Sequence, residues 1–183
     1  MGTVVYDGVE YHKVRDKWVD ANCVMAPKGI QNELDFLQLK QMNLDDYNVY
    51  QLMKLGDEFK NGSSIGFAIK CYNKALEKSD KYETSRILPR LTSCLRKQGK
   101  ADEAVKVYSQ MKAKWGADLF GYVALTSIAA AYCDLGEYED AKKCCNKAYA
   151  LEDGHCSGEL ASVFGRIRKE NNDIGLDFDF DED

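Results

Sequence analysis

Cysteine and histidine could form a metal site near residue 150, where four of them lie close together in the sequence: Cys144, Cys145, His155 and Cys156. Thiolate and imidazole are ligands that Zn²⁺ takes in proteins. Adjacent residues of a helix, however, point about 100° apart, so Cys144 and Cys145 would not face the same ion. No C-x-x-C pair occurs among the seven cysteines. We therefore expect no metal, and we interpret the cysteines as small buried residues of a chain without disulfides.

No other pattern indicates an enzyme. The chain contains neither a G-x-x-x-x-G-K-[ST] loop nor a G-x-G-x-x-G turn, the motifs that hold phosphates and dinucleotides. Neither of the two histidines, His12 and His155, has the setting of a Cys-His-Asp triad. The acidic residues fall on helix faces that we expect to be solvated. We expect no catalytic residue and no cofactor.

A basic helix face is the pattern that could bind a ligand. Its residues recur at i, i+4, i+7 and i+11, the spacing of one helix face: Arg86, Arg90, Ser93 and Lys97. Lys54 and Lys60 precede them and could flank the same surface. The planar fork of arginine holds a carboxylate by two bonds, so this face would suit an acidic segment. The plainer interpretation is a solvated basic face paired with nearby acids.

The composition is that of a globular protein whose net charge is unevenly distributed along the chain. Hydrophobic residues make up 45% of the 183 residues, and charged residues make up 30%. The net charge is −5, but five acids lie in the last seven residues, so the rest carries 25 acidic and 25 basic residues. A neutral body disfavours nucleic acid, which needs a basic field. No run of apolar residues is long enough to span a membrane, and the start lacks a signal-peptide pattern, so we expect a cytoplasmic protein.

Residues of one kind recur at intervals of 36 and 37 in the middle of the chain. Ala68, Ala104 and Ala141 define the interval. The same register aligns large apolar residues and turn glycines: Leu55, Leu91 and Ile128; Phe59, Leu95 and Tyr132; Gly62, Gly99 and Gly136. Within each copy the apolar residues follow a helical period on both sides of the glycine. The pattern predicts three copies of a helix pair.

These copies resemble the tetratricopeptide repeat (TPR) family. The third copy has the turn Gly136-Glu-Tyr138-Glu-Asp-Ala141, followed by Ala148. The second has Gly99-Lys-Ala101-Asp-Glu-Ala104, with alanine in place of the usual tyrosine. The first matches mainly from Ala68 to Leu76. The resemblance covers residues 49–155.

The resemblance implies a mostly α fold, a right-handed superhelix of antiparallel helix pairs. The residues before it indicate a small β-meander. We expect repeats at about 49–82, 85–118 and 122–155, and a cap helix at 157–170, within a helical domain over 30–170. Leu34, Leu37 and Met42 suggest a leading helix that covers the other end of the array. Pro89 requires either that its helix starts near Leu88 or that the helix bends there.

In this family the first helix of each pair lines a concave groove that binds extended peptides, so the resemblance puts the basic face in that groove. Small or polar residues occupy the matching places of the third repeat: Thr126, Ser127, Ala130 and Cys133. The carboxylate-clamp version of the family needs a groove asparagine. Asp57, Ser93 and Ala130 stand in those places, so we do not expect that version.

The two ends of the chain differ from the middle. Val4–Tyr6 and Val9–Val14 flank Asp7-Gly8, a type I′ turn signal, and a third strand could follow in a meander and connector over 1–29. Residues 171–183 form an acidic tail that we expect to be disordered. It alternates acidic with apolar residues, and its candidate motif is Phe178, Asp179, Phe180 and Asp181. Such a motif could dock on another protein or in the groove of this one.

We expect a noncatalytic interaction module that binds a peptide or partner protein, an acidic one in particular, through the concave groove. The alternative is a regulatory or accessory subunit whose N-terminal meander contacts nucleic acid or a larger enzyme complex. Basic residues of the meander motivate nucleic-acid contact, but Asp7, Glu10, Asp16 and Asp20 oppose it. A homo-oligomer is a further alternative, and we expect no membrane partner.

Overall fold

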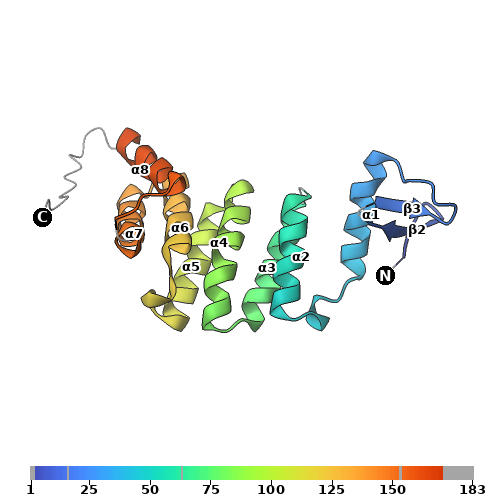
Figure 1. Ribbon diagram of the computed structural model, residues 1–183, viewed down its shortest axis with the longest axis horizontal. Coiled ribbons are helices and arrows are strands. Elements are labelled where there is room, and N and C mark those ends of the chain that lie inside the picture. The colour runs from blue at the N-terminus through green and yellow to red at the C-terminus, as the bar shows by residue number, and fades with distance from the viewer. Residues whose placement is uncertain (1–2, 16, 63, 153, 171–183) are drawn as a thin grey trace, which may run out of the picture. The chain divides into compact units, whose positions relative to one another are not determined.

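The computed structural model describes residues 3–15, 17–62, 64–152 and 154–170 (Figure 1). They fold into two units, Met1–Tyr47 and Asn48–Asp183. The described elements are mainly helical, with one small antiparallel sheet, as the sequence predicts. None of the described helices has the length and apolar composition needed to cross a bilayer.

The sheet of the first unit is a meander of strands β1 (Val4–Tyr6), β2 (Val9–Val14) and β3 (Lys17–Asp20) in that order. Val4 pairs with Tyr11, and Lys13 pairs with Trp18. Asp7 and Gly8 both have positive φ, as a type I′ turn requires. The predicted hairpin is therefore present, together with the third strand.

Helix α1 (Lys28–Gln41) packs on this sheet. Leu34 is fully buried against Val4 and Trp18. Asp35 Oδ1 accepts hydrogen bonds from Trp18 Nε1 (2.8 Å) and Lys13 Nζ (2.9 Å). The structure groups this helix with the sheet in one unit, because a small meander cannot bury its apolar face alone. A short 3₁₀ helix, Leu44–Asp46, follows it.

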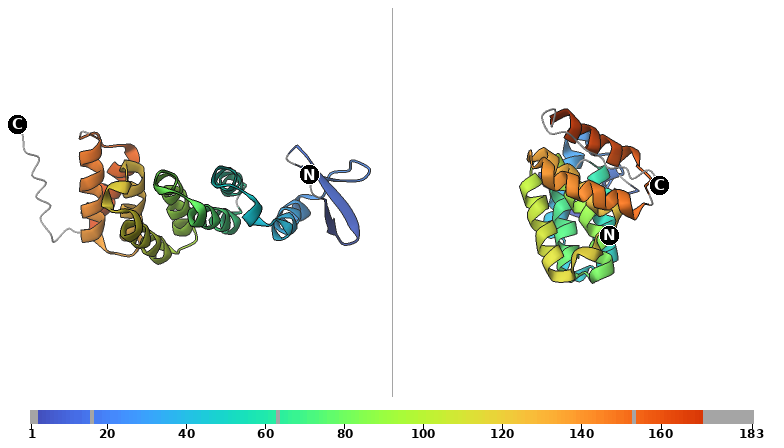
Figure 2. Two further views of the ribbon diagram at one scale, coloured as in Figure 1. Left: turned by 90° about the horizontal axis from the view of Figure 1, so that it is seen from below. Right: turned by 90° about the vertical axis from the view of Figure 1, so that its left-hand side faces the viewer.

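The second unit contains three antiparallel helix pairs among its described residues (Figures 1 and 2). The pairs are α2 (Val49–Asn61) with α3 (Ile65–Lys78), α4 (Lys81–Lys97) with α5 (Ala101–Trp115), and α6 (Tyr122–Asp134) with α7 (Tyr138–Leu151). A 3₁₀ turn, Ala117–Leu119, precedes α6, and helix α8 (Gly158–Glu170) follows α7. The first helices α2, α4 and α6 contact one another in order, and α8 contacts α6 and α7.

Local signals fix where several helices begin and end. Asn48 and Gln51 form a capping box at the start of α2, and Asp80 and Glu83 form another at the start of α4. Gly99 and Gly136, the recurring turn glycines, have positive φ just after α4 and α6. The expected helix pairs are thus delimited by the residues that recur in the sequence.

Small residues lie at the contacts between helices. Ala68, Ala104 and Ala141 have no exposed surface, so the positions that define the repeat are core positions. Leu160, Val163 and Ile167 of α8 are also buried, which confirms the apolar face expected of a cap helix. Arg168 and Lys169 of the same helix are exposed.

Pro89 lies inside α4, because that helix begins eight residues earlier at Lys81. Proline has no N–H, so the carbonyl of Ser85 cannot accept the usual helical bond. The first of the two alternatives for Pro89, a helix that starts near Leu88, is therefore excluded.

Replacing Ala141 by leucine should overpack the contact between α6 and α7 and lower the free energy of unfolding by about 1–3 kcal/mol. Ala150, exposed on the same helix, is the matched control, and Ala150→Leu should change stability by less than about 0.5 kcal/mol. Urea unfolding of both variants measures the difference. Equal stabilities would show that the repeat register is misplaced.

Gly56 of α2 should resist substitution although alanine is the better helix former. A Cβ there would stand 2.5 Å from Cε1 of Tyr72, a fully buried ring. Gly56→Ala should lower the free energy of unfolding by about 1–3 kcal/mol. Gly165 of α8 has open space where its Cβ would be, so Gly165→Ala should raise it by about 0.5–1 kcal/mol. Thermal unfolding that shifts both variants in the same direction would contradict this packing.

A candidate peptide-binding groove

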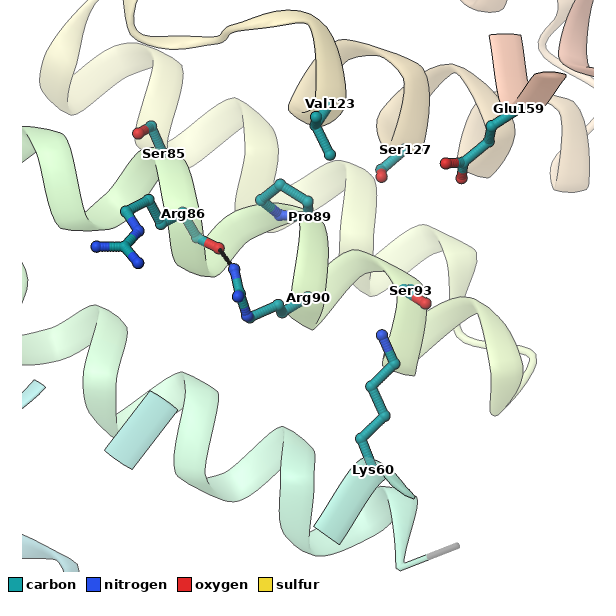
Figure 3. A pocket seen from close by; sticks show the side chains of 9 residues that line it. All are labelled: Lys60, Ser85, Arg86, Pro89, Arg90, Ser93, Val123, Ser127 and Glu159. Carbon is teal, nitrogen blue, oxygen red and sulfur yellow. Dashed lines mark hydrogen bonds between the residues drawn. The ribbon is translucent and has the colours of Figure 1, made fainter. Parts of the chain in front are cut away.

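A groove of about 410 Å³ opens where α2, α4, α6 and α8 meet (Figure 3). Nine described residues line it: Lys60, Ser85, Arg86, Pro89, Arg90, Ser93, Val123, Ser127 and Glu159. Helix α4 supplies five of them, and one face of that helix carries Arg86, Pro89, Arg90 and Ser93 at i, i+3, i+4 and i+7. The structure thus brings three of the residues of the predicted basic face into one groove.

The two sides of the groove differ in character. Arg86, Arg90 and Lys60 lie where α4 faces α2, whereas Pro89 and Val123 lie where α4 faces α6 (Figure 3). Val123 is 55% exposed, although it is a large aliphatic residue. A ligand in this groove would therefore meet cations on one side, and on the other the apolar surface of Pro89 and Val123 beside Ser127 and Glu159.

Arg90 is held in place by a carboxylate of the preceding pair. Its Nε donates to Asp57 Oδ1 (3.1 Å), and its Nη1 donates to the backbone oxygen of Arg86 (2.8 Å). Asp57 also accepts from the buried hydroxyl of Tyr72 (2.6 Å). Burial, together with this hydrogen bond, raises the pKa of Tyr72, so the phenol stays protonated and donates. Asp57 thus fixes the guanidinium beside the groove and neutralises part of its charge.

Arg86 is exposed and forms no ion pair within the part of the chain that the structure describes. Its guanidinium lies 5.9 Å from the centre of the Tyr82 ring, one turn earlier on α4. Tyr82 is 69% exposed. Arginine and tyrosine are enriched at the centres of protein interfaces, so this pair offers a contact point beside the groove residue Arg86.

The remaining predicted residues lie outside this groove. Lys97 lines a neighbouring depression of about 540 Å³, which shares Ser93 with the groove and also contains Arg96 and Asp134. Lys54 is exposed on α2 and lines neither depression. The tail residues Phe178, Asp179, Phe180 and Asp181 lie outside the described residues. Of the positions expected in the third repeat, only Ser127 lines the groove, whereas Thr126, Ala130 and Cys133 are buried.

Asp134 of α6 links three helices, because it forms ion pairs with one arginine of α4 and one of α8. Its carboxylate accepts from Arg96 Nε of α4 (2.5 Å) and from Arg166 Nη2 of α8 (2.7 Å). Burial alone would raise the pKa of Asp134, but the hydrogen bonds and positive charges of the two arginines outweigh it and lower the pKa below its ordinary value. This bridge has no local signal in the sequence, because Arg96 and Arg166 are 70 residues apart.

Several lining residues were absent from the sequence predictions. Val123 stands 37 residues after Arg86, so carrying the repeat interval forward from that arginine would have found it. Pro89 lies within the predicted face but carries no charge. Glu159 could not be found this way, because its place depends on how α8 docks.

The cysteine and histidine cluster does not assemble in the structure. Cys144 and Cys145 are buried in α7, whereas His155 and Cys156 are exposed. Burial raises the pKa of Cys145 to about 12, so its thiol is protonated at neutral pH. No group of three or more metal-ligating side chains occurs in residues 3–15, 17–62, 64–152 and 154–170.

Comparisons with known proteins support the repeat fold. The profile of the PPR repeat matches residues 91–115, from the second half of α4 to the end of α5. No curated protein matches the chain. Among solved structures, the crystal structure of the Sgt2 TPR domain from Aspergillus fumigatus superposes with a TM-score of 0.57 at 16% identity, covering 67% of this chain and 78% of that one. The helical unit therefore has a TPR-type repeat fold.

Asp134→Asn should lower the free energy of unfolding at pH 7 by about 1–2 kcal/mol, because two arginines lose their charged partner. The lowered pKa makes this contribution present at neutral pH and lost as the pH falls below the ordinary carboxyl range, through the folded-state pKa. Asp140→Asn, which removes an exposed pair with Lys143, is the control and should cost less than about 0.5 kcal/mol. Urea unfolding at pH 7 and pH 3 tests both, and a variant difference that does not shrink in acid would contradict the bridge.

Proposed function

We propose that this chain, whose helical unit has the TPR-type fold, is a noncatalytic interaction module that binds an extended, acidic segment of a partner protein. The binding site is the groove formed by α2, α4, α6 and α8. The observation that supports this most strongly is the convergence of Arg86, Arg90 and Lys60 on one side of a groove whose other side includes the apolar surface of Pro89 and Val123.

The charges of the groove favour an acidic ligand. Arg86 and Lys60 form no ion pair among the described residues, and Arg90 donates to Asp57 through only part of its guanidinium. A carboxylate that approaches this side can therefore bind arginine N–H groups without breaking an existing pair. Glu159 is the acid among the lining residues and comes from the α8 side, so it would keep a ligand's acids toward α2 and α4.

The shape of the groove favours an extended ligand. In an extended segment successive side chains point to opposite sides, so alternating acidic and apolar residues would meet the cations and the Pro89–Val123 surface at the same time. A folded partner surface would have to project a narrow ridge to make both contacts.

A protein partner fits better than nucleic acid. Lys13, one of the basic residues of the meander, donates to Asp35 and lies over Trp18. Part of the positive charge that motivated nucleic-acid contact is therefore neutralised within the first unit. The body of the chain is neutral apart from residues 177–183. We place the protein in the cytoplasm, because none of its seven cysteines forms a disulfide.

Binding of synthetic octapeptides tests this function. A peptide that alternates Glu and Leu should bind both the full chain and a chain ending at Gly175, whereas one that alternates Lys and Leu should not. Fluorescence anisotropy would measure both. The affinity of the acidic peptide should fall as salt is raised, because exposed charges are screened.

Two charge reversals in the groove, Lys60→Glu with Arg86→Glu, should lower the affinity for the acidic peptide by about tenfold or more. A tenfold loss corresponds to about 1.4 kcal/mol of binding free energy. Lys106 and Lys112 are exposed on α5 and line neither depression, so Lys106→Glu with Lys112→Glu makes the same change of charge elsewhere and should leave the affinity unchanged. Circular dichroism would confirm that each variant is folded. If the groove variant binds as well as the control, the site lies elsewhere.

A further inference from the structure

We infer that the groove has an occupant within this chain, the acidic segment of residues 176–183, which a partner must displace. This inference rests on the proposed function of the groove and adds its regulation. It follows from three independent features: the pattern of the segment, the two-sided chemistry of the groove, and the place where α8 ends.

The segment has the pattern that the groove would select. Asp177, Asp179 and Asp181 alternate with Phe178 and Phe180. Bound in an extended form, these acids would point to one side and the phenylalanines to the other. The acids would meet Arg86, Arg90 and Lys60, and the rings would cover Pro89 and Val123.

The charges also match. The last seven residues carry five acids, and the rest of the chain has no net charge. Binding would therefore bring the one strongly charged segment of the chain to a surface where Arg86 and Lys60 form no ion pair among the described residues. The exposed surface of Val123, at 55% of its maximum, would be removed from water in the same step.

The end of α8 is close enough for the segment to reach the groove of its own chain. Arg166 of α8 donates a hydrogen bond to Asp134. Asp134 lines the depression that contains Lys97, and this depression shares Ser93 with the groove. Glu170 follows Arg166 by four residues, or about 6 Å along the helix axis. Residues 171–175 can span at most about 18 Å. The depression that holds Lys97 lies between the end of α8 and Arg90, so the chain could pass over a further cation on its way.

Tethering makes even a weak contact effective. A ligand joined to its site by a short linker meets it at an effective concentration of the order of millimolar. A millimolar intrinsic affinity would then keep the groove about half occupied, and a tighter one would keep it mostly closed. An external acidic segment would bind the full chain more weakly than the chain that lacks the tail, by one divided by the fraction of grooves left free, which is about twofold at half occupancy.

The test uses a labelled peptide of residues 176–183 with the full chain and with a chain ending at Gly175, which retains every described element. The shortened chain should bind the peptide, and the full chain should bind it at least twofold more weakly. Phe178→Ser with Phe180→Ser in the full chain should restore binding to the level of the shortened chain. A peptide of the same eight residues with the two phenylalanines adjacent is the matched control and should bind less tightly, because it breaks the alternation.

The outcomes separate this inference from the proposed function. If the shortened chain binds the alternating Glu-Leu peptide but not the tail peptide at millimolar concentration, the function stands and the tail is not the occupant. If neither peptide binds, both fail. If the full chain is a dimer in sedimentation experiments and the shortened chain is a monomer, the segment binds a second copy, and occupation of its own groove is overturned. A monomeric full chain with the weakened affinity described above supports the inference.

Discussion

Each helix pair of this protein can bury its apolar face only against the next pair, and that constraint determines the rest of the helical unit. Ala68, Ala104 and Ala141 have no exposed surface, and their small side chains let successive helices approach closely. Because contacts are made between neighbours along the array, the first helices of successive pairs lie next to one another. The groove of the proposed function lies between these first helices and α8.

Carboxylates between the first helices determine which cations remain available. Asp57 holds Arg90 across α2 and α4, and Asp134 holds Arg96 and Arg166 across α4, α6 and α8. These bridges use arginines to connect layers of the array. Arg86 and Lys60 have no such partner among the described residues, and they line the groove. In the proposed function the same helix face therefore serves both for cohesion and for binding, with the two roles divided between residues one turn apart.

The extent to which the sequence predicts this structure follows from the range of each interaction. The helix pairs could be found because their signals are local: alanines at a fixed interval, turn glycines, and apolar residues at helical spacing. The packing partner of α1 could not be predicted in this way. The pattern around Leu34 shows that one face of the helix must be buried, but it does not show which element covers that face. In the groove, Arg86 and Arg90 were found from spacing on one helix, while Glu159 and the Asp134 bridge depend on how α8 docks. Thr126 was placed in the groove wrongly, since a shift of one residue turns a helical side chain by about 100°.

The central claim is that the face of the first helices, and no other surface, binds an acidic extended segment. Nuclear magnetic resonance tests it most directly, by titrating the chain ending at Gly175 with the peptide of residues 176–183 and following the backbone amide signals. The account predicts that the largest shifts occur at Arg86, Arg90 and Ser127, with little change in α3, α5 and α7. Shifts concentrated in those second helices, or in the strands of the first unit, would contradict it.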